Sequence, residues 1–143
     1  IGDARGALAN ELPPGVELIE LDDGRYRAFA RLPEIVRELA PGIVFCPGNH
    51  YTAAAFWLRQ RLGRACPPLV GKVSNALVRP DLPRGAGSAY RFWLRQHPRF
   101  LDAVVAMTPA MAGEAVGAMG LMPARVHVIP NPPALPIPGA GTG

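Results

Sequence analysis

Polar residues that could handle sugars and phosphates come directly after an apolar run of this chain. Gly48, Asn49 and His50 follow the run 43–46 and precede a segment with helical spacing. A helix N-terminus offers free N–H groups and the positive end of the helix dipole, which favour hydroxyl and phosphate oxygens. His50 can exchange a proton or bind a sugar hydroxyl, so it is the candidate catalytic residue, with Gly48 and Asn49 as substrate-binding residues. The alternative, that Asn49 merely caps the helix, stays open.

A second polar group lies at the end of the next apolar run, 69–73. Lys72, Ser74 and Asn75 are its candidate substrate-binding residues. Lys72 is the only Lys in the chain, and its charge could serve a phosphate. The alternative is that Lys72 lies on an edge strand and guards the sheet against aggregation.

The remaining hydroxyl and thiol groups favour structural roles. Thr108 follows a further apolar run and is a candidate substrate-binding residue, although Ser88 and Thr108 both suit helix caps better than nucleophiles. No Asp or Glu adjoins His50, so a hydrolytic triad has no local support. Cys46 and Cys66 match no zinc or redox spacing and are expected to be buried, reduced thiols. No Gly-x-Gly-x-x-Gly fingerprint, Walker loop or metal-ligand cluster occurs, so neither a metal nor a cofactor is expected.

Aromatic and basic residues are interleaved in the segment 90–100, in a chain with a net charge of +4. Such a segment can bind an anionic membrane surface or stack on RNA. The alternative is an ordinary amphipathic helix whose Phe92 and Trp93 face the core. The residues of the expected membrane or anion patch are Arg91, Trp93, Arg95 and Arg99.

Strands and helices are expected to alternate along the chain, which is typical of a parallel sheet with right-handed crossovers. The fold class is therefore α/β, with a Rossmann-like, mainly parallel sheet and helices on both faces. The runs 43–46 and 103–107 should be central strands, and Pro33 should open a second short helix. The other expected strands are 16–21, 69–73 and 126–129, and the expected helices are 26–40, 51–62, 88–96 and 109–119. Ligands of such folds bind at the carboxyl ends of the strands, so the candidate residues should share one rim.

Four stretches together resemble the N-terminal domains of family 4 glycosyltransferases, which are retaining enzymes with two Rossmann-like domains (the GT-B architecture). The resemblance covers roughly residues 15–133, and its last two stretches are the more specific ones. The stretches that carry it are 40–44 before the Gly-Asn-His turn, 70–75, 99–111 and 125–132.

The resemblance implies an acceptor-side domain over residues 1–129 and an interdomain hinge or linker over 130–143, with a donor domain beyond. The parent enzyme would transfer a sugar from a nucleotide-sugar donor to a glycan or lipid-linked acceptor, as in the synthesis of cell-envelope polysaccharides. It would need no metal, and the fragment alone would be inactive. The implied location is the cytoplasm, peripheral to the inner face of the membrane, and nucleic acid is not an expected partner.

Two departures from the family pattern matter. A first strand with a Gly-rich turn should precede Ile1, and Ser74-Asn75 stands where many members carry a His. Two alternatives therefore stay open. One is a non-catalytic, Rossmann-like nucleotide-binding module, and the other is a basic nucleic-acid-binding domain that uses the segment 90–100.

Overall fold

A computed structural model describes residues 15–17, 19 and 27–132 of the 143-residue chain. The chain divides into two compact units, Ile1–Ala40 and Pro41–Gly143, and each unit is described by itself. Among the described residues, none of the helices combines the length and the apolar character that crossing a membrane requires.

In the N-terminal unit, the helix α1 runs without a break over Arg27–Leu39. Pro33 lies inside it, so the prediction that Pro33 opens a second helix is wrong. The apolar spacing continues on both sides of Pro33, and one amphipathic helix forms although Pro33 supplies no N–H. The strand predicted over 16–21 is not found either: Val16, Glu17 and Ile19 lie outside helices and strands, and the rest of that segment lies outside the described residues.

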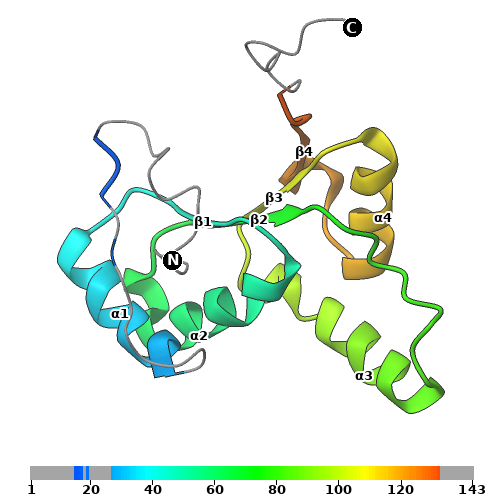
Figure 1. The fold of residues 1–143 in the computed structure, drawn as a ribbon, viewed down its shortest axis with the longest axis horizontal. Helices are drawn as coiled ribbons and strands as arrows, with labels where there is room; N and C mark the ends of the chain where they lie inside the picture. The colour runs from blue at the N-terminus through cyan, green and yellow to red at the C-terminus, as the bar shows by residue number, and fades with distance from the viewer. Residues whose placement is uncertain (1–14, 18, 20–26, 133–143) are drawn as a thin grey trace, which may run out of the picture. The chain divides into compact units, whose positions relative to one another are not determined.

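The C-terminal unit is built on a four-stranded, wholly parallel sheet with the strand order β1-β2-β3-β4 (Figure 1). This sheet confirms the expected Rossmann-like α/β fold. The strands are β1 (Val44–Cys46), β2 (Leu69–Val73), β3 (Ala103–Ala106) and β4 (Val126–Val128). β3 is an interior strand, as predicted. β1 lies at the edge of the described sheet, which corrects the prediction of a central strand there, and the side chain of Phe45 is 51% exposed.

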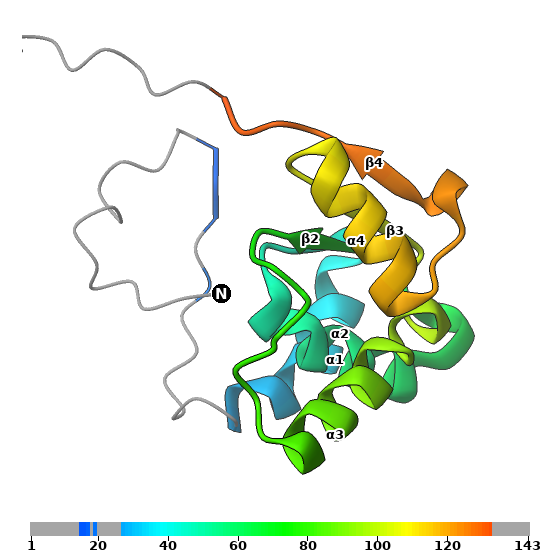
Figure 2. The same cartoon turned by 90° about the vertical axis from the view of Figure 1, so that its right-hand side faces the viewer.

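Three helices of this unit connect consecutive strands: α2 (Thr52–Leu62), α3 (Arg84–Leu94) and α4 (Pro109–Met119). Right-handed crossovers between neighbouring strands that advance in one direction bring the connecting helices to the same face of the sheet. Figures 1 and 2 show α2, α3 and α4 as such a layer along the twisted sheet. Within this unit, one face of the sheet is therefore covered by helices.

The core lies between the sheet and this helical layer. Leu69, Val73, Val104 and Ala106 point into it and are almost fully buried. Burying such a side chain contributes about 1.5–3 kcal/mol for the larger aliphatic residues. Between α2 and α3, an aromatic cluster fills the space, and its members are Phe56, Trp93, His97 and Phe100.

The helix ends were predicted well where a special residue marks them. Gly63 and Gly120 have φ angles of +53° and +77° at the C-termini of α2 and α4, in the region that favours glycine. Thr108 caps α4, because its Oγ1 accepts a hydrogen bond from the N–H of Met111 at 3.2 Å. Thr108 thus has the structural role that sequence analysis gave as its alternative.

The start of α3 was predicted four residues too late. The helix begins at Arg84, directly after Pro83, and Ser88 lies inside it. The Ser88 hydroxyl donates to the carbonyl oxygen of Arg84 at 3.0 Å, so Ser88 is not an N-cap. The glycines of the segment 84–87 masked this first turn, although Gly87 is buried against Leu82.

Candidate functional site

The turns that follow β1 and β2 meet at the carboxyl edge of the sheet. Cys46 pairs with Gly71 in the parallel register, so both strands end at the same edge. A Cβ atom built on Gly48 would lie 3.7 Å from the Ser74 Oγ atom. The structure therefore brings Gly48 and Ser74 together, in van der Waals range, at the rim where ligands of such folds bind.

Asn49 and His50 form a short 3-10 turn, Asn49–Tyr51, ahead of α2. The N-cap of α2 is Tyr51, and no side chain caps that helix, so the interpretation of Asn49 as a simple cap is wrong. The Asn49 backbone oxygen accepts from the Thr52 hydroxyl at 2.8 Å, while its side-chain Oδ1 is buried and has no hydrogen-bond partner among the described residues. The side chain of His50 lies outside the described part of the structure, so its predicted exposure stays a prediction.

Lys72 lies within β2, on the opposite side of the strand from Gly71 and Val73. β2 is flanked by β1 and β3, so Lys72 does not guard an edge strand, and that alternative is wrong. Its Nζ donates to the Oδ1 of Asn131 at 3.0 Å, directly beyond the last strand. Lys72 therefore connects the sheet to Asn131, in the segment 130–143 that was predicted as an interdomain hinge or linker.

The other rim candidates are less engaged. Ser74 is half-buried and Asn75 is exposed, and both directly follow β2. Thr108 is exposed after β3, and its oxygen is already an acceptor in the cap of α4. Of these candidates, Gly48 and Ser74 are the pair that the described structure brings into contact.

The residues of the expected membrane patch differ in their exposure. Trp93 stacks on Phe100 with a centroid separation of 5.7 Å and meets Phe56 edge-on at 5.6 Å, so it belongs to the core cluster. Its neighbour Phe92 is 69% exposed instead. The three arginines of the patch, Arg91, Arg95 and Arg99, are all exposed.

Burial controls the titration of three side chains. Desolvation lowers the pKa of His97, whose Nδ1 lies 3.0 Å from the carbonyl oxygen of Trp93, and the ring is 1% exposed. His97 is thus a buried residue just beyond the C-terminus of α3. Cys46 and Cys66 are buried free thiols. Burial raises the pKa of Cys46 to about 11, and it raises the pKa of Cys66 above the ordinary thiol value. In residues 15–17, 19 and 27–132, no three His, Cys, Asp or Glu residues gather as metal ligands would.

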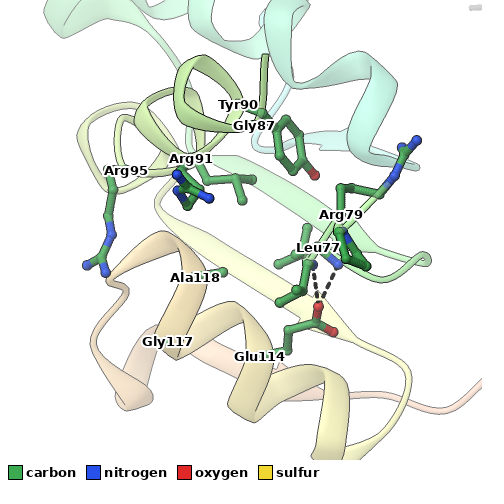
Figure 3. Close-up of a pocket in the computed structure, with 12 residues that line it drawn as sticks. Leu77, Arg79, Gly87, Tyr90, Arg91, Arg95, Glu114, Gly117 and Ala118 are labelled. Atoms are coloured by element: carbon green, nitrogen blue, oxygen red, sulfur yellow. Dashed lines mark hydrogen bonds between the residues drawn. The ribbon is translucent and has the colours of Figure 1, made fainter. Parts of the chain in front are cut away.

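A cavity that was not predicted from the sequence lies on the helical side of the sheet. The cavity lies between the segment 77–80, α3 and α4, and has a volume of about 490 Å³. Glu114 of α4 closes one end, because its Oε1 accepts from the backbone N–H groups of Leu77 at 2.7 Å and Val78 at 2.6 Å (Figure 3). One signal could have pointed to it: Glu114 is the only charged residue of α4.

Comparison with known families gives one match that covers most of the chain. A family model described as a glycosyl transferase 4-like domain matches residues 5–132. The matched range includes the rim, Lys72 and the cavity. No curated protein sequence matches the chain.

Proposed function

The chain belongs to the glycosyltransferase 4-like domain family, and on that premise we propose that it is the acceptor-side domain of a retaining glycosyltransferase. The donor would be a nucleotide sugar, and the acceptor a glycan or a lipid-linked saccharide. The observation that carries this proposal is the meeting of Gly48 and Ser74 at the carboxyl edge of a parallel sheet. Gly48 has no side chain and so leaves room for a ligand, and the neighbouring Ser74 hydroxyl can bind a sugar oxygen.

In this proposal the rim positions the acceptor rather than supplying a covalent nucleophile. His50 would orient the attacking hydroxyl and exchange its proton, while Asn49, Ser74 and Asn75 would hold neighbouring hydroxyls. Holding two reactants in a productive geometry can lower a barrier by about 7–11 kcal/mol, so positioning is a sufficient task for these residues. The charge that develops on the leaving group would be stabilised by the donor domain, which is why the domain alone should be inactive.

Lys72 would serve the proposed enzyme at the boundary between domains. Its ammonium group and Asn131 form a hydrogen bond of 3.0 Å, which ties the segment after β4 to β2. A tied exit segment would restrict the orientations from which a donor domain can close over the rim.

The proposed acceptor also gives the exposed face of α3 a role. Arg91, Arg95 and Arg99 are exposed, and Phe92 beside them is 69% exposed. Arginines attract anionic headgroups, and an exposed aromatic ring can enter the interface of a bilayer. We therefore propose a peripheral position on the cytoplasmic face of a membrane, where a lipid-linked acceptor would be found.

A transfer assay on the full-length natural protein tests the main proposal. The protein is incubated with a panel of nucleotide sugars and with membrane extracts as the acceptor source, and the released product is examined by NMR. We expect transfer with the anomeric configuration of the donor retained, and no transfer by the 143-residue chain alone. A product of inverted configuration would refute the retaining mechanism, and hydrolysis without transfer would refute the acceptor role of the rim.

A further inference from the structure

The cavity of about 490 Å³ shares no lining residue with the rim and has the size of a small-molecule site. Its walls come from the segment after β2 and from the facing sides of α3 and α4. Figure 3 shows Tyr90 and Arg91 on the α3 side, and Leu77, Glu114, Gly117 and Ala118 across from them. The cavity therefore opens between two helices rather than at the strand ends.

Two of the arginines that line the cavity, Arg91 and Arg95, have no carboxylate partner in the described part of the chain. Arg91 donates to a neutral partner, the Ser88 hydroxyl, at 3.1 Å. Arg95 extends toward the C-terminus of α4, since a Cβ atom on Gly120 would lie 2.9 Å from its Nη1. The lining carboxylate, that of Glu114, is turned to two backbone N–H groups. The cavity therefore favours an anion.

Apolar groups form the floor of the cavity beside these charges. Leu77 and Leu94 are buried there. On the α4 side the lining residues Gly117 and Ala118 are small, so they take up little of the cavity. A Cβ atom built on Gly117 would meet no other atom within 4 Å, so this part of the cavity is open space. A ligand that carries only charge would leave the floor in contact with water, whereas a ligand with an apolar portion would displace that water.

We propose that this cavity binds an organic phosphate that carries a small apolar or aromatic group. The phosphate would lie against Arg91, and the positive charge of Arg95 would add to the electrostatic attraction. The apolar group would lie over Leu77, Leu94 and Ala118. Guanidinium groups suit phosphate because their N–H donors match its oxygens in a bidentate geometry. The cavity shares no lining residue with the rim, so the inference does not depend on the proposed transferase activity.

The test is an NMR titration of the 15N-labelled 143-residue chain. The probes are phenyl phosphate, inorganic phosphate and benzyl alcohol. Phenyl phosphate carries both a charged phosphate and an aromatic ring, inorganic phosphate carries only the charge, and benzyl alcohol carries only the ring. We expect phenyl phosphate to shift the amide signals of Leu77, Val78 and Ala118 in a saturable way. Each of the other two probes should bind at least about tenfold more weakly, as the loss of one good contact predicts.

Matched variants separate the cavity from the rest of the surface. Gly117→Leu should abolish binding by filling the open space. Gly113→Leu is its control, because Gly113 is an exposed glycine of the same helix whose Cβ position is also free of neighbours. Arg91→Gln should weaken binding about tenfold, as expected for one charge-assisted hydrogen bond, whereas Arg99→Gln, outside the cavity, should leave it unchanged.

Three outcomes would overturn the proposal. They are the absence of saturable shifts, equal binding to the wild-type chain and Gly117→Leu, and equal affinity for phenyl phosphate and benzyl alcohol. If Gly117→Leu fails to fold, as judged by circular dichroism, the comparison of Arg91→Gln with Arg99→Gln decides the question.

Discussion

The rim and the cavity are held in place by different kinds of interaction. At the rim, parallel strand pairing fixes the backbone on which Gly48 and Ser74 lie. At the cavity, a single side chain, Glu114, holds the segment 77–80 through two hydrogen bonds to N–H groups. Backbone ladders tolerate side-chain replacement, whereas a lone side-chain anchor does not. Changes at the rim should therefore alter chemistry with little effect on stability, and changes at the cavity should alter stability as well.

The strongest test of this contrast is His50→Ala in the full-length protein. Turnover should fall about a hundredfold, the low end for a positioned proton-exchanging group, which corresponds to about 2.7 kcal/mol. The thermal midpoint should hardly move, because the predicted exposure of His50 implies that its removal leaves no core cavity. Steady-state kinetics and a melting curve measure the two effects. His127→Ala is the control, because His127 is exposed on β4, and unchanged turnover in His50→Ala would remove His50 from the site.

Glu114→Ala probes the other side of the comparison. The variant leaves two N–H groups without their acceptor, and the free energy of unfolding should fall by about 2–3 kcal/mol. Alanine is the best helix former, so loss of helix propensity cannot explain the fall. Urea unfolding measures the loss, and hydrogen exchange should show faster exchange at Leu77 and Val78.

Two further variants sharpen the Glu114 result. Glu114→Gln keeps an oxygen acceptor and should lose about half as much stability. Asp81→Asn breaks an exposed pair with Arg79 in the same segment and should cause no measurable change. If Glu114→Ala and Asp81→Asn behave alike, Glu114 is not an anchor.

His97, just beyond the C-terminus of α3, should make the free energy of unfolding depend on pH. Burial lowers its pKa below the ordinary value, so the unfolded chain takes up a proton at this residue more readily than the folded chain does. The contribution of neutral His97 to the free energy of unfolding is therefore complete above the pKa of the unfolded state, which is about 6.5, and is lost as the pH falls below it. The free energy of unfolding should decrease by at most about 1.4 kcal/mol per pH unit in this range. Urea midpoints at several pH values for the wild-type chain and His97→Gln measure it. A slope in His97→Gln equal to that of the wild-type chain would disprove the assignment.

The smallest expected effect concerns the membrane. Phe92→Ser combined with Arg99→Glu should reduce sedimentation with phosphatidylserine-rich vesicles several-fold, since one basic residue near such a surface contributes about 1 kcal/mol. Both residues lie outside the cavity, so binding of phenyl phosphate should survive. Arg64→Glu, an exposed basic residue of another turn, serves as the control. Binding that does not weaken in added salt would contradict an electrostatic patch.

Much of the sheet and its helices could be predicted because local signals carry the information. The apolar runs at β2 and β3, the Thr-Pro start of α4, and the glycines after α2 and α4 each act within a few residues. The same locality explains two errors. Pro33 is a helix starter by its immediate context, yet the apolar stripe around it continues, and Ser88 resembles a cap because the glycines before it hide the first turn.

The cavity and the side-chain environments could not be predicted because they depend on contacts between distant residues. Glu114 meets Leu77 across 37 positions of the chain. Phe92 and Trp93 are neighbours, and only the rotation of α3 about its axis decides which of them faces Phe56 and Phe100. The edge position of β1 likewise follows from strand order, which the sequence of β1 does not contain.

The two buried thiols allow the opening of the sheet to be followed by chemical labelling. A thiol with a pKa of about 11, such as that of Cys46, carries roughly one thiolate per ten thousand molecules at pH 7, so it reacts slowly even with a reagent that reaches it. Cys46 lies on β1, and Cys66 lies in the connection that leads into β2. Alkylation of the native chain therefore requires this part of the sheet to open, and the ratio of the two labelling rates distinguishes local fraying from global unfolding.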